Sequence, residues 1–340
     1  MTPPHAADGR PLGVSVTPFE TRADVVVRVA ERADELGLDH VYVAEGWTYD
    51  AFVLLSELAG RTSRVRIGSG IVSVWARTPA TMAMAAATLQ RRAPGRFTHG
   101  LGASSPPLVE GFHGIGWERP VGRLRATLTA IRALLAGDRN PAPADGARAL
   151  RLGVTPEGRI PIALAALAPA SVRLAGELAD EWAPFLWARS HLGDGRELLR
   201  DGEARSAMPA PTSVSVAVPV ALGPDEDAAR ALAAWWLTTY TTRMGPLYPR
   251  MLGERFGMAA GVEAAVAAAD SGAPPELPPA AEELARDVTL MGTYDEAGQA
   301  VGAWFDAGAD VVDLVLPPGR PEEELLELVG VAGRLVGAGA

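Results

Sequence analysis

The stretch that decides the fold is "VRIGSGIVSVWARTPATMAMAAATLQ", residues 65–90. Its first ten residues are mostly β-branched or small, which is typical of a buried strand. Thr78 and Pro79 then form an N-cap and a first-turn proline, so the Ala- and Met-rich segment behind them predicts a closely packed helix. Gly70 weakens the strand interior, which indicates a bulge or the close approach of another molecule. Relief of crowding in the core is the structural alternative.

The same alternation of strand and helix continues along the whole chain. Eight segments have the apolar, β-rich character of strands: 12–19, 40–47, 65–74, 96–104, 160–167, 181–187, 212–222 and 311–316. Because a helix-like segment follows each of them, the sequence predicts an α/β fold, a (β/α)₈ TIM barrel with insertions at its C-terminal mouth. A doubly wound open sheet is the alternative, but VTPFET after the first strand lacks the glycine-rich dinucleotide fingerprint.

Three segments fall outside this regular pattern, although residues 1–340 are expected to form a single domain. Residues 1–10 contain Pro, Gly and polar residues and are expected to be a flexible leader. Residues 137–147 form a Pro/Gly/Asp-rich linker. Residues 241–296 are too long for an ordinary helix-to-strand connection, so we expect an insertion that acts as a lid over one barrel mouth.

Composition excludes several classes of function. The net charge of −10 argues against a nucleic-acid or anionic-membrane surface. The absence of Cys removes thiolate metal sites and Cys nucleophiles, and the absence of Lys removes Schiff-base chemistry. The five His show no metal-binding spacing, so no metal is expected. Without a signal peptide or a membrane-spanning run, the protein is expected to be cytoplasmic.

Four segments taken together resemble a known family. They are "IGSGIVSVWARTPATMAMAAATL", "PGRFTHGLGASSPPLVEGFHGIGWERP", "IPIALAALAPASVRLAGELADEW" and "GTYDEAGQAVGAWFDAGADVVDLVLP". They are similar to the luciferase-like flavin and deazaflavin oxidoreductases, and more closely to the branch that uses coenzyme F420. The resemblance covers residues 12–337 and implies a (β/α)₈ barrel, bound coenzyme F420 (FMN being the alternative), a small-molecule substrate and a homodimer.

The resemblance also assigns cofactor-binding positions. It implies a non-prolyl cis peptide between Gly70 and Ile71, bulging against the ring of the cofactor. The ring and its phosphate-bearing side chain are then expected to contact Gly70, Ile71, Val72, Gly102, Ala103, Ser104, Ala166, Leu167, Ala168, Pro169 and Ala170. The last three positions begin a predicted helix, whose free N–H groups suit a phosphate without any Lys.

The sequence departs from the family's alcohol dehydrogenases at three positions. Their catalytic His corresponds to Gly46, and two Glu correspond to Ser105 and roughly to Phe19. Because alcohol oxidation needs a base, these changes favour a reductase that passes a hydride to an activated C=C, C=N or C=O. Glu45 and Trp47 lie at the expected mouth and are the candidate catalytic residues. An FMN-dependent monooxygenase and an inactive barrel homologue remain the alternatives.

Overall fold

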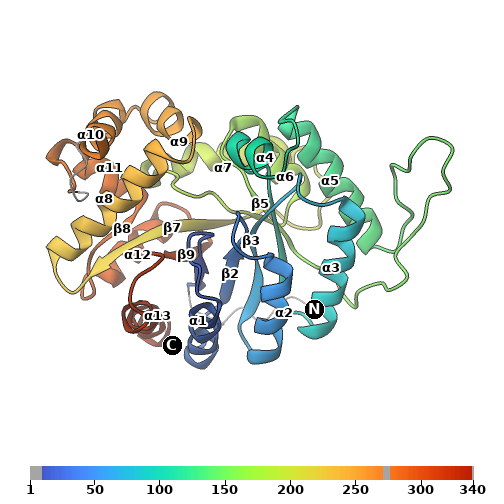
Figure 1. Ribbon diagram of the computed structural model, residues 1–340, viewed down its shortest axis with the longest axis horizontal. Coiled ribbons are helices and arrows are strands. Elements are labelled where there is room, and N and C mark those ends of the chain that lie inside the picture. The colour runs from blue at the N-terminus through green and yellow to red at the C-terminus, as the bar shows by residue number, and fades with distance from the viewer. Residues whose placement is uncertain (1–9, 271–275, 339–340) are drawn as a thin grey trace.

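The computed structural model describes residues 10–270 and 276–338, and the predicted leader, residues 1–10, lies outside them except for Arg10. Eight parallel strands close into a ring, with helices packed outside it (Figure 1). The ring closes because β6 pairs with both β5 and β7, and β9 pairs with both β7 and β1. Its strands are β1 (Leu12–Val16), β2 (His40–Ala44), β3 (Arg66–Ser73), β4 (Phe97–Gly102), β5 (Ile162–Ala165), β6 (Glu181–Trp182), β7 (Ser213–Gly223) and β9 (Val311–Leu316). The predicted TIM barrel is therefore confirmed.

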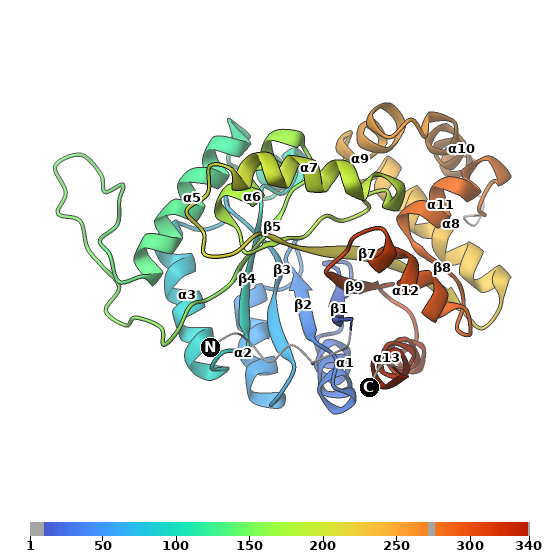
Figure 2. The ribbon, with the colours of Figure 1, turned by 180° about the vertical axis from the view of Figure 1, so that it is seen from behind.

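Most helices pack their apolar faces on the outside of this ring. The α-helices are α1 (Ala23–Leu36), α2 (Ala51–Arg61), α3 (Pro79–Arg92), α4 (Pro106–Gly111), α5 (Pro120–Leu135), α6 (Pro169–Leu178), α7 (Leu192–Glu203), α8 (Glu226–Thr242), α9 (Leu247–Arg250), α10 (Ala259–Asp270), α11 (Glu282–Val288), α12 (Ala297–Asp306) and α13 (Glu322–Ala338). Thr78 caps α3 as the sequence predicts, since its side chain accepts a hydrogen bond from the N–H of Thr81. Figure 2 shows α6 and α7 next to each other in the upper part of the barrel.

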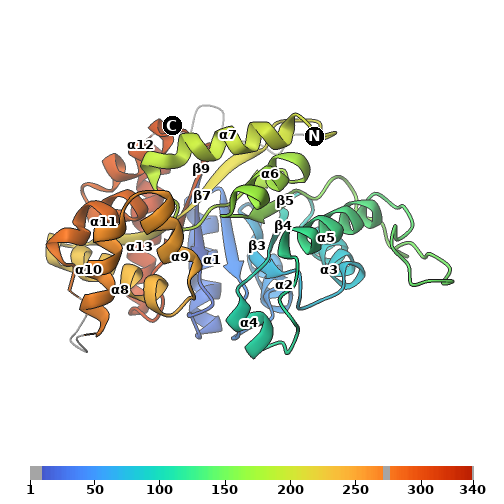
Figure 3. The same cartoon turned by 90° about the horizontal axis from the view of Figure 1, so that it is seen from above.

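The segment 241–296 has its own secondary structure. A π-helix (Met251–Arg255) joins α9 to α10, and a 3₁₀ turn (Pro279–Ala281) precedes α11. The short strand β8 (Leu290–Thr293) lies outside the closed ring, because it pairs only with the far end of β7. Figure 3 shows that α8, α9, α10 and α11 gather on one side of the barrel. A second 3₁₀ turn, Arg189–His191, precedes α7.

The linker after α5 extends away from the barrel as a long loop (Figure 1). It has no regular structure from residue 137 to residue 161, in agreement with its Pro/Gly/Asp content. Across the described ranges, we find no helix with the length and apolarity needed to span a bilayer.

The third strand bulges where the sequence predicts, but with different peptide geometry. Ser69 pairs with Val43, yet the next pair is Ala44 with Ile71, so Gly70 is the extra residue of a bulge. Residues 10–270 and 276–338 contain no cis peptide bond, so the predicted cis bond between Gly70 and Ile71 is wrong. The physical reason is that one inserted residue already displaces the strand without an isomerised bond.

Candidate active site

The bulge in β3 is fixed by a close contact with β4. Ser69 Oγ donates to the carbonyl oxygen of Gly100 and accepts from its N–H, each at 2.9 Å. A Cβ atom on Gly100 would lie 1.7 Å from the carbonyl oxygen of Ser69, so only glycine fits at this position. The hydroxyl of Ser69 thus replaces ladder bonds that the extra residue interrupts, and Gly100 provides the space.

The bulge also decides which side chains face the barrel interior. Ile71 pairs with Ala44 and its Cδ1 atom lies 2.4 Å from where a Cβ of Gly102 would be, so it points inward against β4. Val72 pairs with Leu101 and is fully buried in the apolar layer between strands and helices. The structure therefore brings the predicted ring contacts Gly70 and Ile71 to the interior, whereas Val72 offers only its backbone there.

The predicted ring and phosphate positions lie next to each other. Ser73 of β3 pairs with Gly102 of β4, and Gly102 pairs with Ala165 of β5, so the three strands end side by side. Ala103 and Ser104 follow β4 and are partly exposed, and Ser104 has a positive φ of 65°. The interior at this end is lined by small residues, and the side chain of Ile71 packs into the space beside Gly102.

The N-terminus of α6 presents unpaired N–H groups at the surface. Ala168 is its N-cap and is followed by Pro169 and Ala170, and all three are exposed. The N–H groups of Ala168 and Ala170 have no partner among the residues described, and the first turn carries no acidic residue. Ala166 and Leu167 lead into this turn, with the side chain of Ala166 buried. Unpaired N–H groups at a helix start favour a bound anion.

Arg255 brings a positive charge to this turn, and the sequence analysis did not select it. Its Nη1 donates to the carbonyl oxygen of Leu167 at 2.8 Å, and its Cζ lies 4.5 Å from the centre of the Trp187 ring. Within the described ranges it forms no ion pair with a carboxylate. Arg255 comes from the π-helix of the 241–296 segment, so only the folded chain places it beside α6.

Glu45 and Trp47, the candidate catalytic residues, both lie after β2. The carboxylate of Glu45 accepts hydrogen bonds from Nη1 and Nη2 of Arg77, at 2.6 and 2.8 Å, and from the N–H of Ala51 at the start of α2. Trp47 is 40% exposed and packs edge-on against Phe19, with ring centres 5.1 Å apart. Glu45 therefore holds the β2–α2 loop in place. The catalytic roles of both residues stay predictions.

The three departures from the alcohol dehydrogenase pattern have structural consequences. A Cβ at Gly46 would lie 2.5 Å from Cβ of Pro18, so a histidine does not fit there without movement of the β1 loop. Ser105 is the N-cap of α4, and Phe19 contacts other aromatic rings. None of the three supplies a base.

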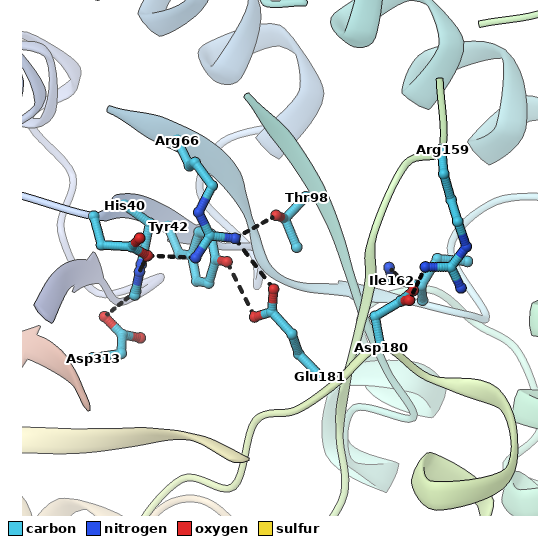
Figure 4. A network of polar contacts seen from close by, with 10 residues as sticks. His40, Tyr42, Arg66, Thr98, Arg159, Ile162, Asp180, Glu181 and Asp313 are labelled. Carbon is cyan, nitrogen blue, oxygen red and sulfur yellow. Dashed lines mark hydrogen bonds and ion pairs between the residues drawn. The ribbon is translucent and has the colours of Figure 1, made fainter. Parts of the chain in front are cut away.

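A network of charged side chains fills the opposite, N-terminal end of the barrel (Figure 4). Arg66 binds Asp39, Thr98 and Glu181, and the hydroxyl of Tyr42 donates to Glu181 at 3.3 Å. We call this network, together with His40, Asp313 and Ser15, the polar floor. Three carboxylates thus face two cations inside the ring.

His40 is the centre of the polar floor. Its Nδ1 lies 2.9 Å from Asp39 and its Nε2 lies 3.3 Å from Asp313. Burial lowers the pKa of His40, but the carboxylates of Asp313 and Asp39 outweigh this and raise it to about 9. Burial likewise works against the charged form of Asp39, yet His40 and Arg66 hold its pKa well below the usual range. The opposite charges of the polar floor therefore neutralise each other.

Comparisons with known proteins identify the family. The model of the luciferase-like monooxygenase family matches residues 5–311. The chain is 29% identical over 313 residues to a putative coenzyme F420-dependent oxidoreductase of Mycobacterium tuberculosis, covering 86% of this chain and 90% of that protein. The chain therefore belongs to the luciferase-like monooxygenase family, and it is an oxidoreductase of that family.

Two solved structures show the same fold at low identity. The coenzyme F420-dependent tetrahydromethanopterin reductase of Methanopyrus kandleri aligns with a TM-score of 0.75 at 18% identity, covering 98% of this chain and 99% of that one. A type II Baeyer-Villiger monooxygenase of Pseudomonas putida in complex with FMN aligns with a TM-score of 0.68 at 18% identity, covering 97% of this chain and 98% of that one. These likenesses confirm the barrel.

Proposed function

We propose that the protein is a coenzyme F420-dependent reductase, which transfers a hydride from the reduced deazaflavin to an activated C=C, C=N or C=O bond of a small organic substrate. The observation that carries the proposal is the start of α6, where exposed N–H groups lie next to Arg255, whose guanidinium bonds the carbonyl oxygen of Leu167 and has no carboxylate partner in the described ranges. The phosphate group of a ring-bearing phosphate ester could bind both to the N–H groups at the start of α6 and to the guanidinium of Arg255. The relative from Mycobacterium tuberculosis supports coenzyme F420 over FMN.

The residues of this chain would hold the cofactor in two places. Gly70 and Ile71 would support its ring at the bulge, and the turn Ala168–Ala170 with Arg255 would bind its phosphate. The bound deazaflavin supplies the hydride, which is chemistry that no side chain can perform. The protein's contribution is to orient the ring and the substrate and to keep water from the ring face.

Reduction fits this site better than alcohol oxidation does. Oxidation of an alcohol needs a base near the reacting hydroxyl, and the crowded Gly46 leaves no space for one at the position where the alcohol dehydrogenases carry it. Glu45 already accepts three hydrogen bonds. A reduction needs only one proton, which a single water molecule could deliver to the substrate.

The test compares the two cofactors and two variants of one exposed residue. Purified protein is titrated with coenzyme F420 and with FMN, and bound cofactor is measured by fluorescence. Ala170→Asp places a negative charge at the α6 start, and Ala170→Asn is its neutral control. Coenzyme F420 should bind the wild type and the Asn variant alike, and the Asp variant about tenfold or more weakly, because like charges repel.

Two results would overturn the proposal. The first is saturable binding of FMN alone, accompanied by oxygen consumption from reduced FMN, which would instead support a monooxygenase. The second is equal binding of coenzyme F420 by the Asp and Asn variants, which would show that the phosphate does not bind at the start of α6.

We further propose that the enzyme is a cytoplasmic homodimer, with segment 241–296 as a lid. The dimer is supported by exposed Val53 and Met84 on the neighbouring helices α2 and α3. The lid is supported by Arg255, because this residue connects the segment to the α6 turn. Sedimentation velocity at micromolar concentration should show a dimer, and a single monomeric species would refute it.

A further inference from the structure

We infer that five aromatic residues form the substrate subsite and that it takes an uncharged, flat aryl compound with a conjugated carbonyl, oriented by the hydroxyl of Tyr240. The residues are Phe19, Trp47, Phe185, Tyr240 and Tyr248, and we call them the mouth aromatic cluster. The inference rests on the proposed function, since it names the substrate class of the same active site.

The cluster lies at the C-terminal mouth of the barrel. Phe19 follows β1, Trp47 follows β2, and the backbone of Phe185 after β6 bridges to Ala217 of β7. Tyr240 near the end of α8 contacts Phe185 with ring centres 4.8 Å apart and Phe19 at 6.3 Å. Parallel strands of a closed barrel end at one mouth, so the helix α8 brings Tyr240 over the strand ends.

The rings are linked without any charged group. Tyr248 of α9 meets Tyr240 edge-on at 5.2 Å and Phe185 at 6.2 Å. No cation–π contact or ion pair in the described ranges involves these five residues. An aromatic wall of this kind favours flat apolar ligands, whereas an ionised ligand would lose hydration without gaining a partner.

Two hydroxyls of the cluster have no hydrogen-bond partner in the described ranges, as is also true of the indole N–H groups of Trp75 and Trp304, whereas several other ring groups are paired. The indole N–H of Trp182 donates to Ala166, that of Trp236 donates to Val220, and the hydroxyl of Tyr42 donates to Glu181. Tyr240 is only 5% exposed, yet neither its hydroxyl nor that of Tyr248 has a partner among the described residues. Neither hydroxyl oxygen is fully buried, so each is able to donate a hydrogen bond to an acceptor on a ligand.

Both tyrosines are donors at neutral pH. Burial raises the pKa of Tyr240 and of Tyr248 well above the usual value, so each hydroxyl keeps its proton. A neutral phenol donates to a carbonyl oxygen, and this bond would draw electrons from a conjugated C=C. With a reduced deazaflavin bound, hydride addition to the β-carbon and a proton from water at the α-carbon would turn the C=C bond into a single bond and would leave the deazaflavin oxidised.

The rim of the same mouth is also apolar. Large hydrophobic side chains are exposed on the loops and short helices that follow the strands, and they are Trp47, Tyr49, Phe112, Ile115 and Leu247. Exposed apolar side chains that gather at one end of a protein mark a site for apolar ligands.

The experiment uses three probes of nearly equal shape. These are 4-phenyl-3-buten-2-one, which has a ketone acceptor, trans-cinnamate, which carries a charge, and trans-1-phenylpropene, which has no acceptor. Binding is measured by saturation-transfer NMR, without cofactor and with oxidised coenzyme F420, for the wild type, Tyr240→Phe and Tyr49→Phe. Tyr49 is the matched control, because it lies at the same mouth but its hydroxyl donates to the backbone of Thr21.

The wild type should bind the ketone at least tenfold more tightly than cinnamate. Tyr240→Phe should weaken ketone binding about five- to tenfold and leave phenylpropene binding unchanged, as expected for one lost hydrogen bond. Tyr49→Phe should change neither. Equal binding of cinnamate, or an equal loss of all three probes in Tyr240→Phe, would overturn the inference.

A turnover measurement separates this inference from the proposed function. With reduced coenzyme F420, Tyr240→Phe should lower kcat/KM for the ketone by at least the loss in binding. Selective ketone binding together with turnover that uses only reduced FMN would overturn the proposed function and support the substrate class. Turnover with coenzyme F420 but no preference for the ketone would support the proposed function and overturn the substrate class.

Discussion

The bulge of β3 makes a prediction that separates two glycines only 30 positions apart. In Gly100→Ala, the new Cβ would lie 1.7 Å from the carbonyl oxygen of Ser69, and real Cβ contacts begin near 3.0 Å. The backbone of β3 must therefore move by about 1.3 Å, the difference between these two distances. In Gly70→Ala, the nearest atoms belong to Ala44 and lie at 3.5–3.6 Å, which is ordinary van der Waals contact.

The two variants should differ strongly in stability. Overpacking a buried backbone contact costs about 1–3 kcal/mol, and Gly100→Ala also disturbs two hydrogen bonds with Ser69, so we expect a loss of about 3 kcal/mol. Gly70→Ala should stay within about 0.5 kcal/mol of the wild type, because the residue does not need a positive φ. Urea denaturation followed by circular dichroism gives both values from the midpoints and slopes.

Cofactor binding provides the second measurement on the same pair. Gly100→Ala should weaken coenzyme F420 binding, because it shifts Ile71 at the proposed ring site. The reasoning is refuted if Gly100→Ala is as stable as the wild type. It is also refuted if Gly70→Ala is the more damaging change to the fold. A loss of cofactor affinity in Gly70→Ala at full stability would instead support close contact between Gly70 and the ring.

Three further predictions concern buried polar groups. Ser69→Ala leaves the N–H and carbonyl of Gly100 unpaired and should cost about 2–4 kcal/mol in urea denaturation, whereas a loss below about 1 kcal/mol would contradict the role of Ser69. Arg77→Met removes the partner of Glu45, whose side chain is 9% exposed, and should lower stability by about 3 kcal/mol; a neutral effect would show that the pair is solvated. Burial, with the charge of Arg77, lowers the pKa of His99 to about 3, so the unfolded chain gains a proton below pH 6.5 that the folded chain does not. The wild type should therefore lose about 2 kcal/mol relative to His99→Leu between pH 7 and pH 5, and parallel stability curves would contradict this.

Local signals in the sequence were sufficient for most of the barrel. Helix α3 begins at Pro79 behind the Thr78 cap, as predicted, because capping and first-turn proline act within one turn. Strand ends were less predictable. Strands β1 and β2 end at Val16 and Ala44, before the predicted ends at residues 19 and 47. The prediction was too long because Phe19 and Trp47 are apolar, yet their side chains contact each other at the mouth and take no part in strand pairing.

Long-range contacts account for what the sequence did not reveal. Gly70 marks a bulge, but the reason for the bulge lies on β4, in the space at Gly100. Arg255 belongs to an insertion that has no pattern of its own, and it meets the α6 turn only after folding. Strand β8 is four residues long and lies outside the ring, so its pattern was too short to be recognised. For the mouth aromatic cluster, the available signal was Tyr240, which lies four residues after its ring contact Trp236 on one helix, although Trp236 is not a member of the cluster.

The distribution of residue size and charge along the barrel axis limits where chemistry can occur. At the N-terminal end, Arg66 and His40 are held by the carboxylates of Asp39, Glu181 and Asp313, so these groups are committed to one another. At the C-terminal end the interior positions are small and the surrounding rings are uncharged. The charged groups at the N-terminal end are therefore not free to bind a ligand, whereas the rings at the mouth offer hydrogen-bond donors such as the hydroxyl of Tyr240. This arrangement favours the proposed hydride transfer with a proton from water, because that reaction requires the protein chiefly to position the cofactor and the substrate.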